Sequence, residues 1–430
     1  MATKRGSQKP GKAGLQCNPR LLVPLRSLAM TISNTLQSQL KKNFPMSQFA
    51  DSASETHTFS HSAIETGSLR ENLIRRLTRA RSATESLVQT LAPEDQNLQS
   101  MPSVSPAKWH RAHTTWFFET FVLEPHVRQY ARFERAFSEL FNSYYNGVGR
   151  QYPRPHRALL SRPDVNEVGR YRQHVDRALK NLLWGCGGTV FKQIAPLVEL
   201  GINHEQQHQE LMLTDLKHAL SYNPLAPRIG DALNAPGAAP GPTDFVRFDS
   251  GTTEVGADGP GFCFDNETPR HKVWLPNAFE LANRPVNCEE FLEFIDDGGY
   301  RNPLLWLSDG WTWVQENSIE APLYWSRTEA GWQIRTLSGT RPIDPAEPAC
   351  HLNFYEAQAF AEWAGARLPS EAEWESAAAG RACRGNFADS GRFHPAAPEM
   401  DAEAPLAALF GDVWEWTQSA YAPYPGFKPA

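Results

Sequence analysis

The sequence predicts a multidomain chain that joins an all-α region to an α+β region. Residues 65–222 contain four amphipathic segments with the 3.6-residue periodicity of helices. A stretch rich in Pro, Gly and Ala, NAPGAAPGPT, follows them, and beyond it short β-like runs alternate with turns and capped helices. Together these observations predict a four-helix bundle, a linker at 223–244 and an α+β domain at 245–430.

Composition places the chain among globular proteins and excludes several partner classes. It has 430 residues, 41% of them apolar, which is enough for two or three domains. The net charge of −6 and the pI near 6.1 give no electrostatic basis for binding nucleic acid or an anionic membrane. No apolar run approaches membrane-spanning length. The six cysteines are scattered without a CxxC pair, so we expect a reducing, cytoplasmic location and no cysteine-based zinc cluster.

Residues 1–60 form a basic leader. The first 50 residues contain no Asp or Glu. Such a composition predicts a disordered tail or a stretch that precedes the true start, and an organelle transit peptide is the alternative. Its basic residues are Lys4, Arg5, Lys9, Lys12, Arg20, Arg26, Lys41 and Lys42.

The four bundle helices are predicted from their apolar stripes and end signals. Pro93 ends or bends the first helix. Ser105 is expected to cap the second, with Pro106 at its first position. The helices are expected at 69–91, 105–123, 168–184 and 190–221.

One face of the second helix is aromatic and also carries a histidine. Because residues three and four apart share a helix face, His113 is expected to point toward the aromatic core. His110 lies one turn away, so a two-histidine site on this helix remains an alternative. The residues on this face are Trp109, His113, Trp116, Phe117 and Thr120.

A long irregular segment, FNSYYNGVGRQYPRPHR, separates the second and third helices. Loops of this length in a compact domain are usually functional or disordered, and the aromatic content argues against disorder. Tyr144 and Tyr145 are candidate proton donors, and Arg154 and Arg157 could bind a carboxylate. A packed loop with solvated arginines is the alternative.

The region from 245 onward shows strand and helix-capping signals. The runs FVRF, HKVWL and FELA predict strands. Three capping boxes, beginning at Asn287, Asn353 and Ser370, predict helices. These helices should end at Gly298-Gly299, Gly365 and Gly380.

The stretch GINHEQQHQELML, residues 201–213, carries the strongest chemical signal. On a helix His204 and His208 point the same way, and Gln207 lies on that side. Two histidines one turn apart form a common half-site for a transition metal. His113, from another helix of the bundle, is the best third ligand. Three neutral histidines with open coordination positions suit zinc or non-haem Fe(II), and the spacing does not choose between them.

The same stretch also matches the HExxH signature of zinc proteases, which is weak by itself. An extended protease motif would need Gly at 211 and His at 214. Those positions hold Leu211 and Thr214.

Two runs in the bundle, SPAKWHRAHTTWFFE (105–119) and HEQQHQE (204–210), resemble the ergothioneine-biosynthesis sulfoxide synthases of the EgtB type. In that family a DinB-like bundle precedes a formylglycine-generating-enzyme-like domain with a C-type-lectin-like fold. The runs RLPSEAEWE (367–375) and GDVWEWT (411–417) resemble hallmarks of the second domain. The resemblance covers about residues 65–430 and implies the same two-domain architecture here.

The resemblance implies an oxygenase with a mononuclear Fe(II) bound by His113, His204 and His208. It implies O2-dependent joining of a thiol to C2 of the imidazole of hercynine (histidine trimethylbetaine), with oxidation to a sulfoxide. Gln207 matches the family residue that contacts hercynine. The Tyr144-Tyr145 pair resembles the active-site tyrosines of a subgroup that accepts free cysteine, whereas other members use γ-glutamylcysteine.

The family pattern continues beyond the point where this chain stops at Ala430. The sequence is therefore expected to be a C-terminally truncated member, with an incomplete second domain. The sequence leaves two other functions open. One is a zinc-dependent hydrolase or thiol transferase on the bundle, and the other is a carbohydrate-binding or scaffold protein that uses the lectin-like domain.

Overall fold

The structure is a computed structural model that describes residues 59–143, 145–230, 241–259, 261–400 and 405–429. The described residues divide into two compact units, one ending at Gly230 and one covering 241–428. Residues 1–58 of the predicted leader and residues 231–240 of the linker lie outside the described residues, whereas residues 59 and 60 already belong to the first helix. No helix in the described part of the chain combines the length and apolar character needed to cross a membrane.

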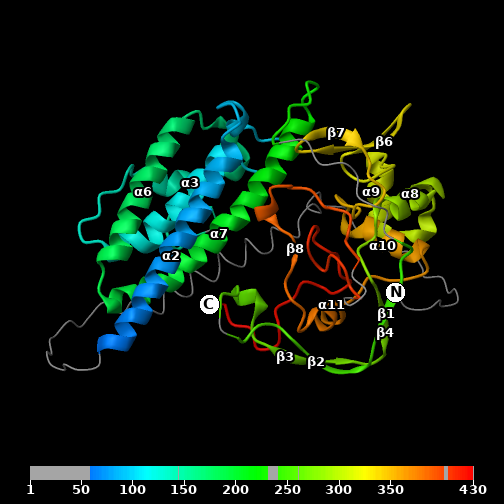
Figure 1. Ribbon diagram of the computed structural model, residues 1–430. Coiled ribbons are helices and arrows are strands. Elements are labelled where there is room, and N and C mark those ends of the chain that lie inside the picture. Colours follow the sequence, from blue (N-terminus) through cyan, green and yellow to red (C-terminus); the bar gives the residue numbers. More distant parts are fainter. Residues whose placement is uncertain (1–58, 144, 231–240, 260, 401–404, 430) are drawn as a thin grey trace. The chain divides into compact units, whose positions relative to one another are not determined.

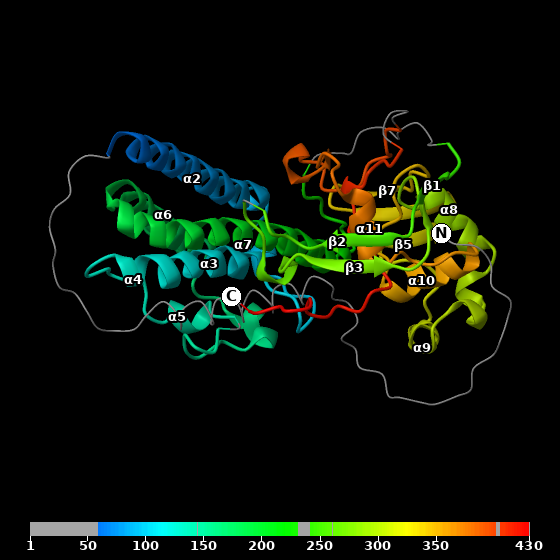
Figure 2. The ribbon, with the colours of Figure 1, turned by 90° about the horizontal axis from the view of Figure 1, so that it is seen from below.

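The first unit is a bundle of four long helices that pack side by side (Figures 1 and 2). Helix α7 contacts both α2 and α3, and α6 contacts the same two helices. The bounds are α2 (Phe59–Val88), α3 (Ala107–Phe118), α6 (Val165–Gly185) and α7 (Gly188–Ser221). The predicted third and fourth helices are confirmed, and each extends slightly beyond the predicted residues.

Shorter elements join the long helices. They are η1 (Asp95–Asn97), the π-helical η2 (Glu119–Leu123), α4 (Glu124–His126), α5 (Phe137–Leu140) and η3 (Arg154–Leu159). The predicted second helix therefore changes to π-helical geometry at Glu119. This residue is 1% exposed, and its carboxylate accepts hydrogen bonds from the hydroxyls of Tyr130 (2.9 Å) and Tyr171 (2.6 Å).

The predicted cap of the second helix is wrong. Pro106 occupies the N-cap position, and no side chain caps α3. The hydroxyl of Ser105 instead accepts a hydrogen bond from the guanidinium of Arg157 at 2.7 Å. The hydroxyl oxygen predicted to cap the helix therefore pairs with Arg157, which lies 52 residues away in the sequence.

The bundle core includes a close approach between α3 and α7. A Cβ on Gly201 would lie 2.3 Å from Cε1 of Phe118 and 2.8 Å from Cε1 of Phe117. Only a residue without a side chain lets the two helices come this close. Gly201 lies one turn before His204, so this contact brings the histidine-bearing part of α7 against α3.

The second unit contains small sheets and short helices. The predicted strands FVRF and FELA pair antiparallel as β1 (Phe245–Phe248) and β4 (Phe279–Ala282). HKVWL forms β3 (His271–Leu275), which pairs antiparallel with β2 (Gly251–Val255). The remaining strands are β5 (Trp325–Thr328), β6 (Gly331–Thr336) and β7 (Gly339–Pro342) in one antiparallel sheet, and the parallel pair β8 (Gly385–Asn386) and β9 (Phe410–Gly411).

The predicted capping boxes of the second unit are confirmed. Asn287, Asn353 and Ser370 each accept a hydrogen bond from the backbone N–H three residues later, and a glutamate returns the bond. The helices are α8 (Cys288–Asp296), α9 (Ser308–Asn317), α10 (Phe354–Trp363) and α11 (Glu371–Ala378). The 3₁₀ turns are η4 (Asp265–Glu267), η5 (Gly299–Arg301), η6 (Pro303–Leu305) and η7 (Ala388–Ser390).

An aromatic core joins the helices and sheet of this unit. Phe291 and Phe294 of α8 are fully buried, and the Phe360 ring of α10 lies 5.4 Å from that of Phe291. Trp325 of β5 packs against Phe291 at 5.9 Å. The mixed helix and sheet content agrees with the α+β prediction.

Candidate metal centre

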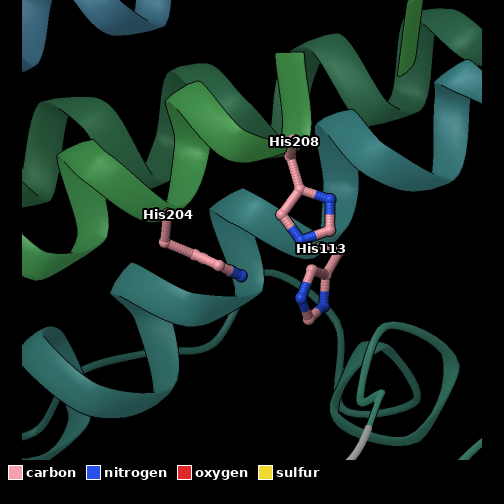
Figure 3. A group of neighbouring side chains, drawn as sticks. All are labelled: His113, His204 and His208. Atoms are coloured by element: carbon pink, nitrogen blue, oxygen red, sulfur yellow. The ribbon is translucent and has the colours of Figure 1, made fainter. Parts of the chain in front are cut away.

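Three histidines from two helices of the bundle converge. His113 comes from α3, and His204 and His208 lie one turn apart on α7 (Figure 3). One nitrogen from each ring lies within 4.8 Å of the corresponding nitrogens of the other two. The three residues are 2%, 5% and 9% exposed, respectively. The structure thus brings together the three residues that the sequence singled out.

Burial keeps these imidazoles neutral. It lowers the pKa of His113 and His208 well below the usual value, and the neighbouring His204 lowers both pKa values further. Burial also lowers the pKa of His204 to about 4. Since only a neutral imidazole has a lone pair to give to a metal, all three rings are in the ligand form at neutral pH.

Two of the rings are oriented by hydrogen bonds at Nδ1. Nδ1–H of His113 donates to the carbonyl oxygen of Phe141 at 2.6 Å. Nδ1 of His208 lies 2.8 Å from Nδ1 of His110. In both residues Nε2 is left for a metal, an arrangement common for histidine ligands.

The third ring is held by packing. Nδ1 of His204 is buried and makes no hydrogen bond within the described residues. Its ring lies 5.0 Å from that of Phe117 and 5.1 Å from that of His113, measured between centroids.

The donor set fits a divalent transition metal. Metal–imidazole bonds are about 2.1 Å long, so small movements of the rings would bring the three nitrogens to a common ion. Three neutral ligands leave the charge of the ion uncompensated and leave coordination positions open, as in catalytic zinc and non-haem iron sites.

An aromatic stack holds the ring of His113. The indole of Trp116 lies on it with a centroid distance of 5.6 Å and an interplanar angle of 15°. Trp109 also stacks on it, and the guanidinium carbon of Arg157 lies 3.4 Å from the ring centroid of Trp109. The sequence placed Trp109, His113 and Trp116 on one face, and the structure confirms this grouping.

Of the two predicted arginines, Arg157 belongs to this stack. Arg157 is 2% exposed, and its charge contributes to lowering the pKa of both His113 and His208. Arg154, at the start of η3, is half-buried, and Nη1 donates to the carbonyl oxygen of Ser103 at 3.3 Å. Gln207 is partly exposed on α7, next to His208.

Of the two predicted tyrosines, Tyr144 lies outside the described residues. Tyr145 is 2% exposed, and its ring packs at 5.3 Å from Trp116 and 5.2 Å from Phe121. Burial raises the pKa of its hydroxyl, so the phenol stays protonated at neutral pH. The ring of Trp116 contacts both the ring of Tyr145 and the ring of His113.

A buried ionic network, which was not predicted from the sequence, supports α7 next to the histidines. Glu205 is fully buried and binds the guanidinium groups of Arg81 (2.8 Å) and Arg172 (2.9 Å). These charges lower the pKa of Glu205 to about 2 despite its burial. Thr84 donates to the same carboxylate at 2.6 Å. The network connects α2, α6 and α7. Its one indication in the sequence is the presence of ionisable residues on the apolar faces of the predicted helices.

Comparisons with known proteins find a matching family and several similar proteins. A family described as "Sulfatase-modifying factor enzyme 1-like domain" matches residues 233–405. The chain is similar to a protein named hercynine oxygenase from Mycolicibacterium thermoresistibile, at 33% identity over 84% of this chain and 82% of that protein. Proteins of the same name from Mycolicibacterium smegmatis and Mycobacterium tuberculosis are 36% and 35% identical, over 54% and 53% of this chain and 57% of each relative.

Proposed function

The chain belongs to the hercynine oxygenase family, and on that premise we propose that it joins a thiol to hercynine in an Fe(II)- and O2-dependent reaction that yields a sulfoxide. The step belongs to ergothioneine biosynthesis. We propose cysteine or γ-glutamylcysteine as the thiol. The observation that carries the proposal is the convergence of His113, His204 and His208 on one space in the bundle.

The metal site is proposed to lie entirely within the bundle, which we propose to be of the DinB type. The chemistry that iron supplies when bound is reduction of O2 and Lewis-acid binding of a thiolate. The protein's part is to keep three imidazoles neutral and oriented. Burial supplies the first requirement, and the hydrogen bonds of His113 and His208 together with the aromatic stack supply the second.

Hercynine carries an imidazole and a carboxylate, and the proposed contacts follow from those groups. Gln207 can hydrogen-bond the imidazole of the substrate, because it follows His204 by three residues on the same helix and is partly exposed. Arg157 is the stronger candidate for the carboxylate, since its charge acts on two of the three histidines. Arg154, three residues earlier on η3, is the second candidate.

A tyrosine hydroxyl is proposed to donate the proton that the reaction requires. Tyr144 and Tyr145 are the candidates. Tyr145 has a protonated, buried phenol, but its described ring contacts are to Trp116 and Phe121. The proposal therefore needs both positions to be tested separately.

The test is anaerobic reconstitution of the protein with Fe(II), followed by hercynine, O2 and either thiol. Formation of the hercynyl sulfoxide, measured by mass spectrometry, together with hercynine-dependent O2 consumption supports the proposal. The matched control is the same protein loaded with Zn(II), which should consume no O2. Absence of product with either thiol would overturn the substrate assignment.

A zinc-dependent hydrolase or thiol transferase is the competing proposal, because three histidines also suit catalytic zinc. Metal analysis of protein purified without added metal separates the two. Stoichiometric zinc that resists replacement by Fe(II), together with no O2 uptake, would favour the zinc enzyme.

A further inference from the structure

We propose that His110 and Asp215 are positioning residues that hold His208 in the tautomer whose Nε2 faces the metal. The inference rests on the proposed metal centre and adds two residues that do not themselves touch the ion. It follows from a chain of hydrogen bonds that runs outward from His208.

The chain has three members from two helices. Nδ1 of His208 on α7 lies 2.8 Å from Nδ1 of His110 on α3. The other nitrogen of His110, Nε2, lies 3.2 Å from Oδ2 of Asp215, which is again on α7. His110 is 4% exposed, so water does not compete freely for either contact.

The carboxylate sets the direction of both bonds. A carboxylate oxygen only accepts, so the proton between His110 and Asp215 must be on Nε2 of His110. The Nδ1 atom of a neutral His110 then carries a lone pair and accepts from Nδ1–H of His208. This places the remaining lone pair of His208 on Nε2. The opposite arrangement would set the lone pair of His110 Nε2 against the oxygen of Asp215 and would put a proton on the metal-facing nitrogen of His208.

The position of Asp215 is itself determined by the start of α3. The backbone N–H of Ser105 donates to Oδ2 of Asp215 at 2.8 Å. The same oxygen thus receives two donors, one from the residue before the N-cap of α3 and one from His110. The carboxylate of Asp215 cannot rotate away from His110 without also losing its hydrogen bond from the Ser105 N–H.

The arrangement parallels the one at His113 but differs in what receives the proton. Nδ1–H of His113 donates to a backbone carbonyl. Nδ1–H of His208 instead donates to the side chain of His110, which in turn donates to the carboxylate of Asp215. Outer hydrogen-bond partners of this kind raise the basicity of the ligand, and their loss typically lowers metal affinity by about 10- to 100-fold. Spacing suggested His110 as a ligand, but within the described residues the three-ligand group consists of His113, His204 and His208.

The test is titration of the full chain with Co(II), whose visible absorption reports ligand geometry. In His110→Phe and Asp215→Leu the Co(II) dissociation constant should rise by about 10- to 100-fold and the absorption bands should shift. Asp215→Asn should behave closer to the wild type, because its amide oxygen can still face the N–H of Ser105 and accept from His110. His208→Ala gives the reference for complete loss of the ligand.

The matched control is His218→Phe. His218 lies on the same helix as Asp215, and its Nδ1 is 2.7 Å from the hydroxyl of Ser100. It should leave the Co(II) affinity and spectrum unchanged. Unchanged Co(II) binding in folded His110→Phe and Asp215→Leu would overturn the proposal, and so would an equal change in His218→Phe. If His110→Phe does not fold, the contrast between Asp215→Asn and Asp215→Leu decides.

The titration needs no hercynine, thiol or O2. Failure of the proposed reaction therefore leaves this inference standing, whereas unchanged Co(II) binding overturns it even if the chain makes the product.

Discussion

The imidazole of His113 lies parallel to the indole of Trp109, with ring centroids 4.6 Å apart and an interplanar angle of 11°. The ring of His113 is thus restrained by stacking as well as by its hydrogen bond to Phe141. Within the described residues, His113 is the member of the three-histidine group that α3 supplies, so this restraint would affect whether its nitrogen reaches a bound ion.

Replacing His113 by Ala should abolish tight metal binding. The two remaining histidines form only a half-site, so we expect the Fe(II) content after anaerobic reconstitution and desalting to fall more than about tenfold. Metal analysis by mass spectrometry measures this content. The control is His156→Ala, at an exposed position of η3, which should retain wild-type iron. Full iron loading of His113→Ala would remove this residue from the site.

The variant Gly201→Ala should weaken metal binding although it changes no ligand. The added Cβ would lie 2.3 Å from the Phe118 ring, so α7 must move away from α3 and separate His204 from His113. We expect a loss of about 1–3 kcal/mol in unfolding free energy and a higher Co(II) dissociation constant. The matched control is Gly169→Ala on α6, where the nearest atom is 3.9 Å from the new Cβ. It should be neutral or stabilising by up to about 1 kcal/mol.

Neutralising Glu205 should destabilise the bundle strongly. Glu205→Gln leaves the buried guanidinium groups of Arg81 and Arg172 without their shared carboxylate, which typically costs about 3–5 kcal/mol. Urea unfolding followed by the far-ultraviolet helical signal measures the change. Glu199→Gln is the control on the same helix, because Glu199 pairs with Arg76 at 2.6 Å in a solvent-accessible position. That variant should lose less than about 1 kcal/mol, and equal losses in the two variants would contradict the role of burial.

The metal-free protein should lose stability between pH 6.5 and pH 4. Burial lowers the pKa of His204 to about 4 in the folded chain, whereas the pKa of an ordinary solvated histidine is about 6.5, so the unfolded chain binds a proton that the folded chain does not. Stability therefore falls as pH falls through this window, by roughly 3 kcal/mol for the full shift. Urea midpoints at several pH values measure the slope. His204→Asn should reduce the slope without abolishing it, because burial also lowers the pKa of His113 and His208. Saturating Co(II) should oppose the loss at the upper end of the window, because the metal binds only the neutral imidazole.

Separate Tyr144→Phe and Tyr145→Phe variants should identify the proton donor. The variant that lacks the donor should lose sulfoxide formation by about 100-fold or more while keeping Fe(II) and hercynine affinity, because only the proton transfer is removed. Single-turnover product formation and metal content are the two measurements. Wild-type rates in both variants would eliminate the tyrosines from the reaction.

Local structure was predictable from the sequence where the interacting groups are close along the chain. The capping boxes at Asn287, Asn353 and Ser370 are confirmed because each box closes over three residues. The proximity of His204 and His208 followed from helical spacing in the same way.

Partners far apart in the sequence were not predictable by spacing. The bond from Asp215 to His110 spans 105 residues, and that from Glu205 to Arg81 spans 124. Periodicity identifies the inward face of each helix but not which residues on two inward faces meet. Ser105 is an example. Its position in the sequence suits a helix cap, but its hydroxyl accepts a hydrogen bond from Arg157 and does not cap α3.

The placement of two candidate ligands on α7 and one on α3 has a consequence for how the protein acquires its metal. His204 and His208 are adjacent as soon as one turn of α7 exists, so a nascent chain already offers a bidentate chelate. An ion captured there would gain its third bond only when α3 docks, and would favour docking by that bond energy. Metal availability during synthesis would then act as a folding aid for the bundle, and a chain completed under metal starvation would have to assemble α3 against α7 by packing alone.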